Sequence, residues 1–323
     1  MKKIVVVGGG TGSFTVLRGL KRHEAELSAI VSMADDGGST GILRDELGVL
    51  PPGDVRQCLV ALSDSSRLMR SLMNYRFTEG SLSGHNFGNL LLCAMEKVTG
   101  SFEKAVEEVG KVMKINGKVI PVTTTDVRLH MELANGEMLK GEGQIYGSEK
   151  ISGGYKRIFL EPTPVPDEHA IAEIMAADLI VFGPGGLYSS LIPLLLVPGI
   201  AKAFMESKAE KVFVVNLMNR LGQTNNFSVA SYLQEIGYFM DSNVFDHILV
   251  NNGLPSNDLV HKYADEGSLV KNDLVESDTR VIAADLISDK LKEVQEGDTM
   301  VRNLIRHDPK KLALELMKIV NNI

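Results

Sequence analysis

The sequence predicts an α/β protein with a Rossmann-like, three-layer arrangement, in which helices cover both faces of a mostly parallel sheet. Short apolar runs alternate with helix-like segments along the chain, which is the order of a doubly wound fold. Most of these runs are almost continuously apolar, as expected for strands buried on both faces. Two of them end in glycine-rich loops that open the next helix. We therefore expect one large α/β domain over residues 1–323.

Six apolar runs are the expected strands of this sheet. Each is short, rich in Val, Ile or Ala, and followed by turn residues or a polar loop. The expected strands are Ile4–Val7, Ser28–Met33, Leu179–Phe182, Val212–Val215, His247–Val250 and Arg280–Ala283.

Helix-like stretches between these runs are the expected helices. The last one is well marked, because Asp308 is a suitable N-cap and Pro309 fits the first helical position. The expected helices are Phe14–Arg22, Val55–Leu62, Phe87–Val98, Ile200–Ser207, Ser228–Ile236 and a final helix from Pro309 to about Val320.

Residues 118–162 depart from this pattern. The stretch VRLHMEL alternates between apolar and polar residues, and Asn135-Gly136 follows it. Alternation predicts a strand with one exposed face, and Asn-Gly is a strong signal for a two-residue hairpin turn. We expect a small antiparallel β-hairpin insertion within the main domain.

Composition excludes several classes of partner. The formal net charge of −7 argues against a nucleic acid or an anionic membrane. The most apolar stretch, Leu191–Ile200, contains two prolines and is about half the roughly 20 residues that a membrane span needs. No signal-like segment begins the sequence, so we expect a cytoplasmic protein. Cys58 and Cys93 lie in apolar helical patterns and are expected to be buried core thiols.

The first glycine loop follows the first expected strand. It brings backbone N–H groups and a helix N-terminus to one point, which suits a phosphate. Its spacing is neither GxGxxG nor a P-loop, so a purely structural turn is the alternative. The candidate binding residues are Gly9, Gly10, Thr11 and Gly12.

Two adjacent acids, Asp35 and Asp36, follow the second expected strand. Carboxylates in this position suit a sugar hydroxyl or a divalent metal beside a phosphate, and a solvated turn is the alternative. Both are candidate metal ligands, and candidate catalytic residues if the protein is an enzyme. The loop continues with the candidate binding residues Gly38, Ser39 and Thr40.

Two charged residues further along this segment are open to more than one interpretation. Arg44 could balance a phosphate. Asp54 precedes an expected helix, so it could cap that helix or belong to the site.

Three more polar or glycine-rich loops add candidate ligand-binding residues. Loops that leave the carboxyl ends of parallel strands line one crevice, so we expect these loops to meet the first two. Asn86 and Asn89 could instead cap or pack a helix, and the glycines could simply form a turn. The candidate residues are Asn86, Asn89, Gly183, Gly185, Gly186, Tyr188, Ser189 and Asn216.

Four stretches together resemble a known family. GGGTGSFTVLRGLK, DDGGSTGILRDELGVLPPGDVRQCLVALS, GHNFGNLLL and GPGGLYSSLIP are similar to motifs of the 2-phospho-L-lactate transferase (CofD-like) superfamily, and most closely to its bacterial gluconeogenesis-factor branch. The resemblance implies a Rossmann-like fold. It also implies a nucleotide diphosphate ligand, with Mg²⁺ in the transferase branch and a UDP-sugar such as UDP-N-acetylglucosamine in the bacterial branch.

The resemblance further implies that Arg306 contacts the ligand, and that the protein supports cell shape and cell-wall precursor synthesis on gluconeogenic carbon sources. It leaves two functions open. One is a nucleotide-sugar-binding regulator that acts through a partner, for instance a cell-wall or amino-sugar biosynthesis protein. The other is a Mg²⁺-dependent phospholactyl transferase. We also expect a homo-oligomer, and NAD(P) is a further possible ligand.

Overall fold

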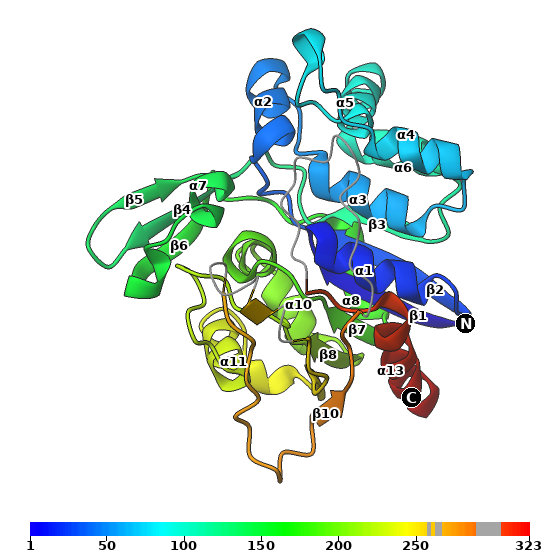
Figure 1. Ribbon diagram of the computed structural model, residues 1–323. Helices are drawn as coiled ribbons and strands as arrows, with labels where there is room; N and C mark the ends of the chain where they lie inside the picture. Colours follow the sequence, from blue (N-terminus) through cyan, green and yellow to red (C-terminus); the bar gives the residue numbers. More distant parts are fainter. Residues whose placement is uncertain (257–259, 262–266, 289–304) are drawn as a thin grey trace.

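The computed structural model describes residues 1–256, 260–261, 267–288 and 305–323. Its main element is a seven-stranded parallel sheet with the strand order β10-β9-β8-β7-β1-β2-β3, and a three-stranded sheet with the order β5-β4-β6 lies beside it (Figure 1). Helices cover both sides of the main sheet, which confirms the predicted fold class.

All six predicted strands are present in the main sheet. One further strand, β3, was not predicted, and it pairs in parallel with β2 at the sheet edge. The strands are β1 (Lys2–Gly8), β2 (Ala25–Val31), β3 (Lys118–Pro121), β7 (Leu179–Phe182), β8 (Glu210–Val214), β9 (His247–Asn251) and β10 (Val281–Ala284).

All six predicted helices are also present, and the structure adds others between them. The helices are α1 (Gly10–Leu20), α2 (Gly38–Leu47), α3 (Gly53–Leu62), α4 (Arg67–Asn74), α5 (Phe87–Thr99), α6 (Phe102–Met113), α7 (Glu142–Tyr146), α8 (Glu168–Ala176), α9 (Ile192–Leu195), α10 (Ile200–Glu206), α11 (Val229–Gly237) and α13 (Pro309–Asn322). A π-helix, η3, covers Leu187–Leu191.

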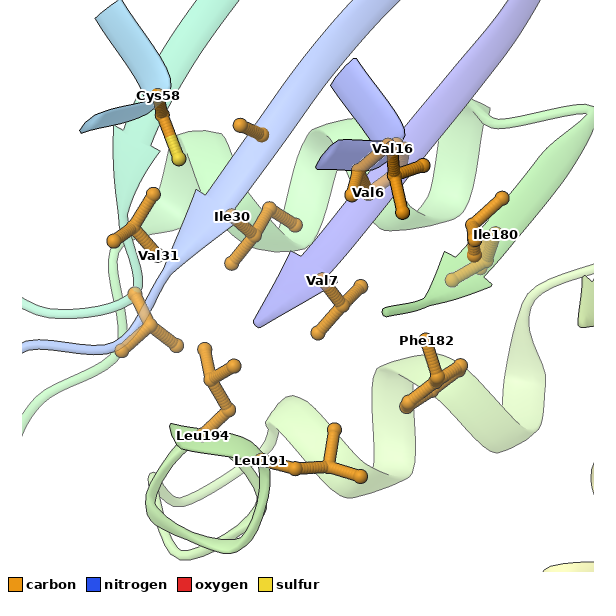
Figure 2. Close-up of a cluster of buried hydrophobic side chains, with 14 of the residues drawn as sticks. Val6, Val7, Val16, Ile30, Val31, Cys58, Ile180, Phe182, Leu191 and Leu194 are labelled. Atoms are coloured by element: carbon orange, nitrogen blue, oxygen red, sulfur yellow. The ribbon is translucent and has the colours of Figure 1, made fainter. Parts of the chain in front are cut away.

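The core lies between the sheet and its two helical layers. Apolar side chains of the central strands point alternately to the two faces, and each face is covered by helices that bury them. Cys58 and Cys93 are buried and unpaired, as predicted. Figure 2 shows strand residues Val6, Val7, Ile30 and Ile180 among Val16 and Cys58 of α1 and α3 and Leu191 and Leu194 near α9.

The predicted insertion forms the three-stranded antiparallel sheet of β4 (Arg128–Leu133), β5 (Met138–Lys140) and β6 (Tyr155–Glu161). The turn at Asn135-Gly136 joins β4 to β5, and Gly136 has a φ of +89°, which favours glycine. The insertion begins later than predicted. Residues 118–121 form β3 instead, because Val119 and Ile120 are buried against the main core.

Side-chain contacts fix the small sheet to the main domain. Gln223 donates to the carbonyl oxygens of Ile145 and Tyr146 at the end of α7, at 3.1 and 2.7 Å. The Arg220 guanidinium lies 3.6 Å from the centre of the Tyr146 ring. Glu235 of α11 accepts a hydrogen bond from the Tyr155 hydroxyl of β6. The position of α7 is therefore set from the main domain, which matters because α7 carries part of the site.

Within the described residues, no single helix has both the length and the apolar composition needed to cross a membrane. The segments Leu187–Leu195 and Ile200–Glu206 meet these criteria only when taken together, and they are bent by 77° relative to each other.

The first glycine loop, residues 8–13 after β1, touches the loop of residues 183–186 after β7, which we call the fourth loop. Val7 of β1 pairs with Phe182 of β7, so the loops that follow both strands leave the same edge of the sheet. A Cβ atom added at Gly12 would overlap the carbonyl oxygen of Pro184. Glycine is therefore required at position 12 for the close approach of the two loops.

We expect Gly12→Ala to destabilise the fold. Alanine is intrinsically better than glycine inside a helix by about 1 kcal/mol, but the overlap with a backbone oxygen should cost more, about 1–3 kcal/mol or above. For a chain of this length that predicts a melting temperature lower by at least about 2 °C in a thermal melt. Gly153→Ala is the matched control, because a Cβ there meets nothing within 4 Å. Equal melting temperatures for the two variants would contradict the prediction.

Candidate functional site

The site lies where the strand order of the main sheet reverses. The chain runs from β1 to β2 and β3 on one side, then returns to β7 beside β1 and continues to β8, β9 and β10 on the other. In open α/β sheets, ligands bind in the crevice outside the carboxyl ends of the strands at such a switch point. Here the loops that follow β1, β2 and β7 all leave that edge, which we call the carboxyl rim.

Gly9 lies in close contact with residues of two other elements. A Cβ atom at Gly9 would collide with the carboxyl group of Asp54 and would lie 3.5 Å from the Cβ atom of Ser190. The glycine therefore lets α3, which carries Asp54, and the π-helix η3 approach the first loop from two sides.

Asp54 does not cap its own helix. The N-cap of α3 is Pro52, and the Asp54 carboxylate accepts a hydrogen bond from the backbone N–H of Gly10 in the first loop. Burial, together with the charge of Asp35, raises the pKa of Asp54 from its ordinary 3.8 to about 7. The capping interpretation is therefore wrong, because the side chain turns across to α1.

Asp35 faces the same region from the end of β2. It accepts hydrogen bonds from the N–H of Gly37, at 3.0 Å, and from the side chain of Thr40. Burial is the main cause that raises its pKa, and the charge of Asp36 adds to the effect. A Cβ atom at Gly53 would approach the carboxyl of Asp35 to 2.6 Å, so glycine at the start of α3 lets Asp35 and α3 pack closely.

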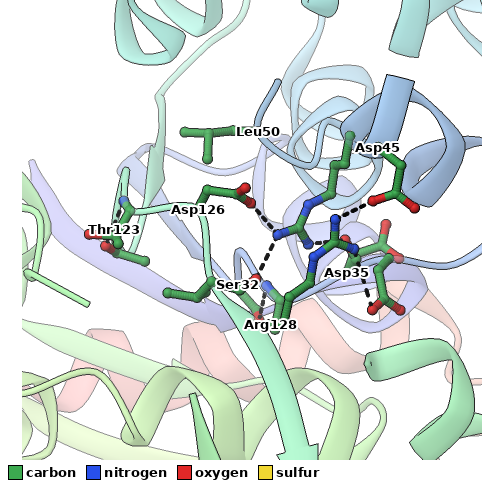
Figure 3. A network of polar contacts seen from close by, with 12 residues as sticks. Ser32, Asp35, Asp45, Leu50, Thr123, Asp126 and Arg128 are labelled. Atoms are coloured by element: carbon green, nitrogen blue, oxygen red, sulfur yellow. Dashed lines mark hydrogen bonds and ion pairs between the residues drawn. The ribbon is translucent and has the colours of Figure 1, made fainter. Parts of the chain in front are cut away.

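Arg44 supports the acidic turn from behind and is not available to a ligand. Its fully buried guanidinium donates to the carbonyl oxygen of Asp35 at 2.8 Å and to that of Val127 at 2.6 Å, and it forms an ion pair with Asp126. Figure 3 shows this network of polar contacts around Asp35, Asp126 and Arg128. The prediction that Arg44 balances a phosphate is therefore wrong.

Asp36 points away from Asp35, towards the small sheet. It accepts a hydrogen bond from the N–H of Gly143 at 2.7 Å, and Arg128 lies 3.7 Å from its carboxyl. A backbone N–H donor and one positive charge thus hold Asp36 already. Of the two adjacent acids, Asp35 is the one that faces Asp54.

Glu142 is a site residue that the sequence analysis missed. It begins α7, and it reaches the carboxyl rim from the small sheet. Burial and the charges of Asp35, Asp54 and Asp36 raise its pKa to about 9, while a hydrogen bond with Ser189 opposes that rise. The sequence does contain a signal for this residue, because Glu142 lies between two glycines. In the structure, Gly141 and Gly143 both pack close to Asp36.

The three carboxyl groups of Asp35, Asp54 and Glu142 form what we call the acidic cluster. Protein atoms surround them closely enough to raise all three pKa values, yet each residue stays partly accessible to solvent. Carboxylate oxygens are the ligands that Mg²⁺ prefers, so their chemistry fits this ion.

The geometry does not form a closed metal cage. Among the described residues, no group of three or more His, Cys, Asp or Glu side chains is arranged to hold a metal by itself. Mg²⁺ commonly uses one or two carboxylates together with the phosphates of its ligand. The acidic cluster therefore fits a Mg²⁺ ion that arrives with a phosphate.

Two of the backbone N–H groups expected to face a phosphate are already engaged. That of Gly10 donates to Asp54, and that of Gly185 donates to the Asn216 side chain at 2.9 Å. Asn216 also donates back to the carbonyl oxygen of Gly185 at 2.8 Å. Asn216 thus holds the fourth loop in shape, and a phosphate has to reach other groups of the rim.

The predicted site residues Asn86 and Asn89 lie at the start of α5, and Ser39 of α2 is close to them. Buried Asn86 caps α5 by accepting from the N–H of Asn89 at 3.2 Å, and Asn89 accepts from Arg56 at 2.9 Å. Ser39 lies 3.3 Å from His85. These polar atoms hold helices together in this structure.

The remaining predicted residues divide between the rim and other places. Ser189, in η3, faces Glu142, and π-helical turns are frequent at functional sites. Tyr188 is buried, with its ring edge-on to Tyr155. Arg306 follows β10, three strands from β7, where its carbonyl oxygen accepts from the N–H of Ser288. Thr11 and Gly38 are exposed. In the fourth loop, Gly183 lies beside Ser13 and Gly186 lies beside Ser189.

Two surface hollows lie away from the acidic cluster. One, of about 330 Å³, is at the opposite edge of the sheet, where His247, Glu210 and the end of α13 meet. The other, of about 640 Å³, lies beside β5 and the residues after α7. Neither hollow is lined by the glycine loops or the acidic cluster. The carboxyl rim is the candidate site because polar and acidic groups from several elements meet there.

Comparison with known proteins gives a family match over most of the chain. Residues 4–291 match the family model described as 2-phospho-L-lactate transferase CofD. A gluconeogenesis factor of Bacillus subtilis (strain 168) is 38% identical, and the alignment covers 98% of this chain and 98% of that protein. A gluconeogenesis factor of Halalkalibacterium halodurans is 44% identical, with 82% of each chain covered.

A solved structure agrees with the fold. The crystal structure of a UPF0052 family member from Bacillus halodurans superposes with a TM-score of 0.88 at 38% identity, covering 98% of this chain and all of that one. The match therefore includes both the main sheet and the insertion.

The raised pKa of Asp54 predicts how stability depends on pH. The unfolded chain loses this proton near pH 4, whereas the folded protein keeps it up to about pH 7. Asp54 therefore destabilises the fold progressively between these values, and its full cost is present above pH 7. We expect Asp54→Asn to raise the melting temperature by a few degrees at pH 8 and by less at pH 5, without divalent cations.

Asp64→Asn is the control for this measurement, because the Asp64 side chain is 63% exposed. We expect it to shift the melting temperature little at either pH. An Asp54→Asn effect of the same size at pH 5 and pH 8 would mean that Asp54 ionises normally in the folded protein.

Proposed function

This chain belongs to the CofD (2-phospho-L-lactate transferase) family, and from that premise we propose that it is a regulatory protein that binds a nucleotide sugar, of the UDP-N-acetylglucosamine kind, together with Mg²⁺ at the carboxyl rim. The family match and the similarity to gluconeogenesis factors supply the family context. The role in cell shape and in cell-wall precursor synthesis on gluconeogenic carbon, and a cytoplasmic location, are parts of the same proposal.

The acidic cluster is the observation that carries the proposal. Asp35, Asp54 and Glu142 come from three separate elements; the charge of Asp35 raises the pKa of Asp54, and the charges of Asp35 and Asp54 both raise the pKa of Glu142. Like charges held together in this way gain most from a bound cation. A diphosphate can share that cation, and it would add the ligands that the protein does not provide.

The chain's own groups would orient such a ligand. Gly9 lets Asp54 and η3 approach the first loop, so that the carboxyl of Asp54 lies beside it. Ser189 brings a hydroxyl group to the carboxyl of Glu142. Arg44 and Thr40 hold Asp35 in place from behind. Bound Mg²⁺ would neutralise carboxylate charge and polarise the phosphate oxygens.

A phospholactyl transferase is the second candidate function. The family description names that activity, and the acidic cluster suits it, because transfer from a diphosphate carrier depends mostly on positioning and on charge stabilisation. The two functions share one site and differ in whether a product is released.

We expect nucleotide sugars to stabilise the protein only when Mg²⁺ is present. A ligand at 100 times its dissociation constant adds about 2.7 kcal/mol, which raises the melting temperature by about 4 °C for a chain of this length. The thermal melt is run against UDP-N-acetylglucosamine, other UDP-sugars, GDP and NAD(P), each with MgCl₂ or with EDTA. Calorimetric titration then gives the affinity.

Asp35→Asn should lower the Mg²⁺-dependent affinity at least about tenfold, because it removes a charge and keeps the hydrogen-bond acceptor. Asp64→Asn is the matched control and should bind normally. Stabilisation that is equal in EDTA, or an unchanged affinity of Asp35→Asn, would exclude the acidic cluster as the cation site.

Turnover distinguishes the two candidate functions. If the regulator proposal is right, the protein with GDP-linked phospholactate, a deazaflavin alcohol and Mg²⁺ should yield no phosphodiester product by mass spectrometry. Formation of that product, lost in Asp35→Asn and retained in Asp64→Asn, would replace the regulator with the transferase.

A further inference from the structure

Arg220 carries a positive charge that no described residue neutralises. It is half-buried, and its side chain makes no hydrogen bond or ion pair with another residue that the structure describes. The guanidinium lies over the ring of Tyr146, 3.6 Å from the ring centre, and Tyr146 is still 43% exposed. A guanidinium has five N–H donors, and a cation–π contact occupies none of them. Arg220 is therefore held in place with its donors available to a ligand.

The loop that carries Arg220 belongs to the carboxyl rim. It follows β8, and Asn216 in this loop exchanges two hydrogen bonds with Gly185 of the fourth loop. The hydroxyl of Thr224 accepts from the backbone N–H of Arg220 at 2.9 Å, and the buried Tyr232 hydroxyl lies 3.3 Å from it. The backbone at Arg220 is thus fixed to the same rim as the glycine loops.

Helix α7 relates Arg220 to the acidic cluster. Glu142 begins this helix and Tyr146 ends it. Residues four positions apart lie on the same side of a helix, separated by about 6 Å along its axis. The guanidinium over Tyr146 is therefore about one helical turn from Glu142. A ligand as long as a nucleotide diphosphate can contact both ends of this turn.

Two other arginines beside the acidic turn are already paired. Arg44 forms an ion pair with Asp126, and Arg128 forms ion pairs with Asp36 and Asp45. A diphosphate that shares Mg²⁺ with the acidic cluster brings further negative charge close to carboxylates, which opposes binding. A cation on the other side of the ligand offsets this repulsion. Arginine suits that role, because its planar guanidinium donates to two phosphate oxygens at once.

We propose that Arg220 binds phosphate oxygens of the Mg²⁺-bound ligand, and that Tyr146 is the positioning residue that holds its guanidinium. The inference rests on the proposed function, since it assigns a further binding residue to the same site. In this arrangement the acidic cluster takes the cation, and Arg220 takes phosphate oxygens that the cation leaves free. The ligand class is a diphosphate, whether within a nucleotide sugar or free in solution.

Calorimetric titration of the full-length protein in MgCl₂ tests the proposal with two probes, UDP-N-acetylglucosamine and inorganic pyrophosphate. We expect Arg220→Gln to weaken the binding of both at least about tenfold, because charge-assisted hydrogen bonds to phosphate are lost. Arg220→Lys keeps the charge without the planar fork and should lose affinity to an intermediate extent.

Arg157→Gln is the matched control. Arg157 also lies over an aromatic ring, that of Phe159 at 4.8 Å, but it is 62% exposed and is paired with Glu132 at 2.9 Å. The substitution removes the same charge and the same kind of contact from the small sheet. It should therefore leave the affinity for both probes unchanged.

Tyr146→Leu separates ligand binding from the docking of α7. Tyr146→Leu and Arg220→Gln remove the same cation–π contact, but only Arg220→Gln removes the N–H donors. We expect Tyr146→Leu to weaken binding by only about threefold, and Tyr146→Phe, which keeps the ring, to restore most of that loss. Equal losses in Arg220→Gln and Tyr146→Leu would mean that Arg220 only docks the small sheet, and would overturn the proposal.

The two probes distinguish failure of this proposal from failure of the proposed function. Wild-type affinity for UDP-N-acetylglucosamine that is retained in Arg220→Gln would overturn the role of Arg220 and leave the proposed function standing. A wild type that binds only pyrophosphate, with that affinity lost in Arg220→Gln, would support the role of Arg220 and overturn the nucleotide-sugar ligand. A wild type that binds neither probe would overturn both.

Discussion

The burial of several carboxyl groups at one place is the constraint on which the site depends, because burial is the largest cause of each raised pKa and neighbouring carboxylate charges add to it. Asp35, Asp54 and Glu142 come from different elements; Asp35 raises the pKa of Asp54, both raise the pKa of Glu142, and the adjacent Asp36 raises that of Asp35. The surrounding structure balances this repulsion with fixed donors: the N–H groups of Gly10 and Gly37, the side chain of Thr40 and the buried guanidinium of Arg44 behind the turn. The N–H groups and the Thr40 hydroxyl are neutral, and the one cation, Arg44, is already paired with Asp126. The arrangement is therefore one that a cation completes, and the proposed Mg²⁺-dependent ligand follows from it.

The fold makes this concentration of charge possible. Parallel strands bring the loops after β1, β2 and β7 to one rim, and the reversal of strand order between β1 and β7 opens the rim there. Glycine at positions 9 and 12 removes the side chains that would otherwise keep α3 and the fourth loop away. The small sheet then adds α7 from the other side, fixed by Gln223 and Arg220. Close packing and the acidic chemistry thus have the same structural origin.

The sequence predicted the fold more fully than the site. Continuous apolar runs identified six strands, because burial on both faces leaves a local signature. The edge strand β3 escaped notice, since its four residues resemble the start of the insertion. Asp54 was interpreted as a possible cap because that role is local, whereas its real partner, Gly10, is 44 positions away in the sequence. Glu142 was missed for the same reason: only the docking of the small sheet brings it to the rim. The rim contacts of Arg306 remain a prediction.

The hydrogen bond from Gly10 to Asp54 has a consequence for how occupancy would be controlled. In many proteins the N-terminus of such a helix binds an anion from solution. Here the N–H of Gly10, at the N-terminus of α1, donates instead to the Asp54 carboxylate of the same chain. Ligand entry then becomes an exchange reaction, in which an internal competitor has to be displaced, protonated or bridged. The fraction of protein with bound nucleotide would then depend on the Mg²⁺ concentration and the pH as strongly as on the nucleotide concentration. One binding equilibrium would respond to all three.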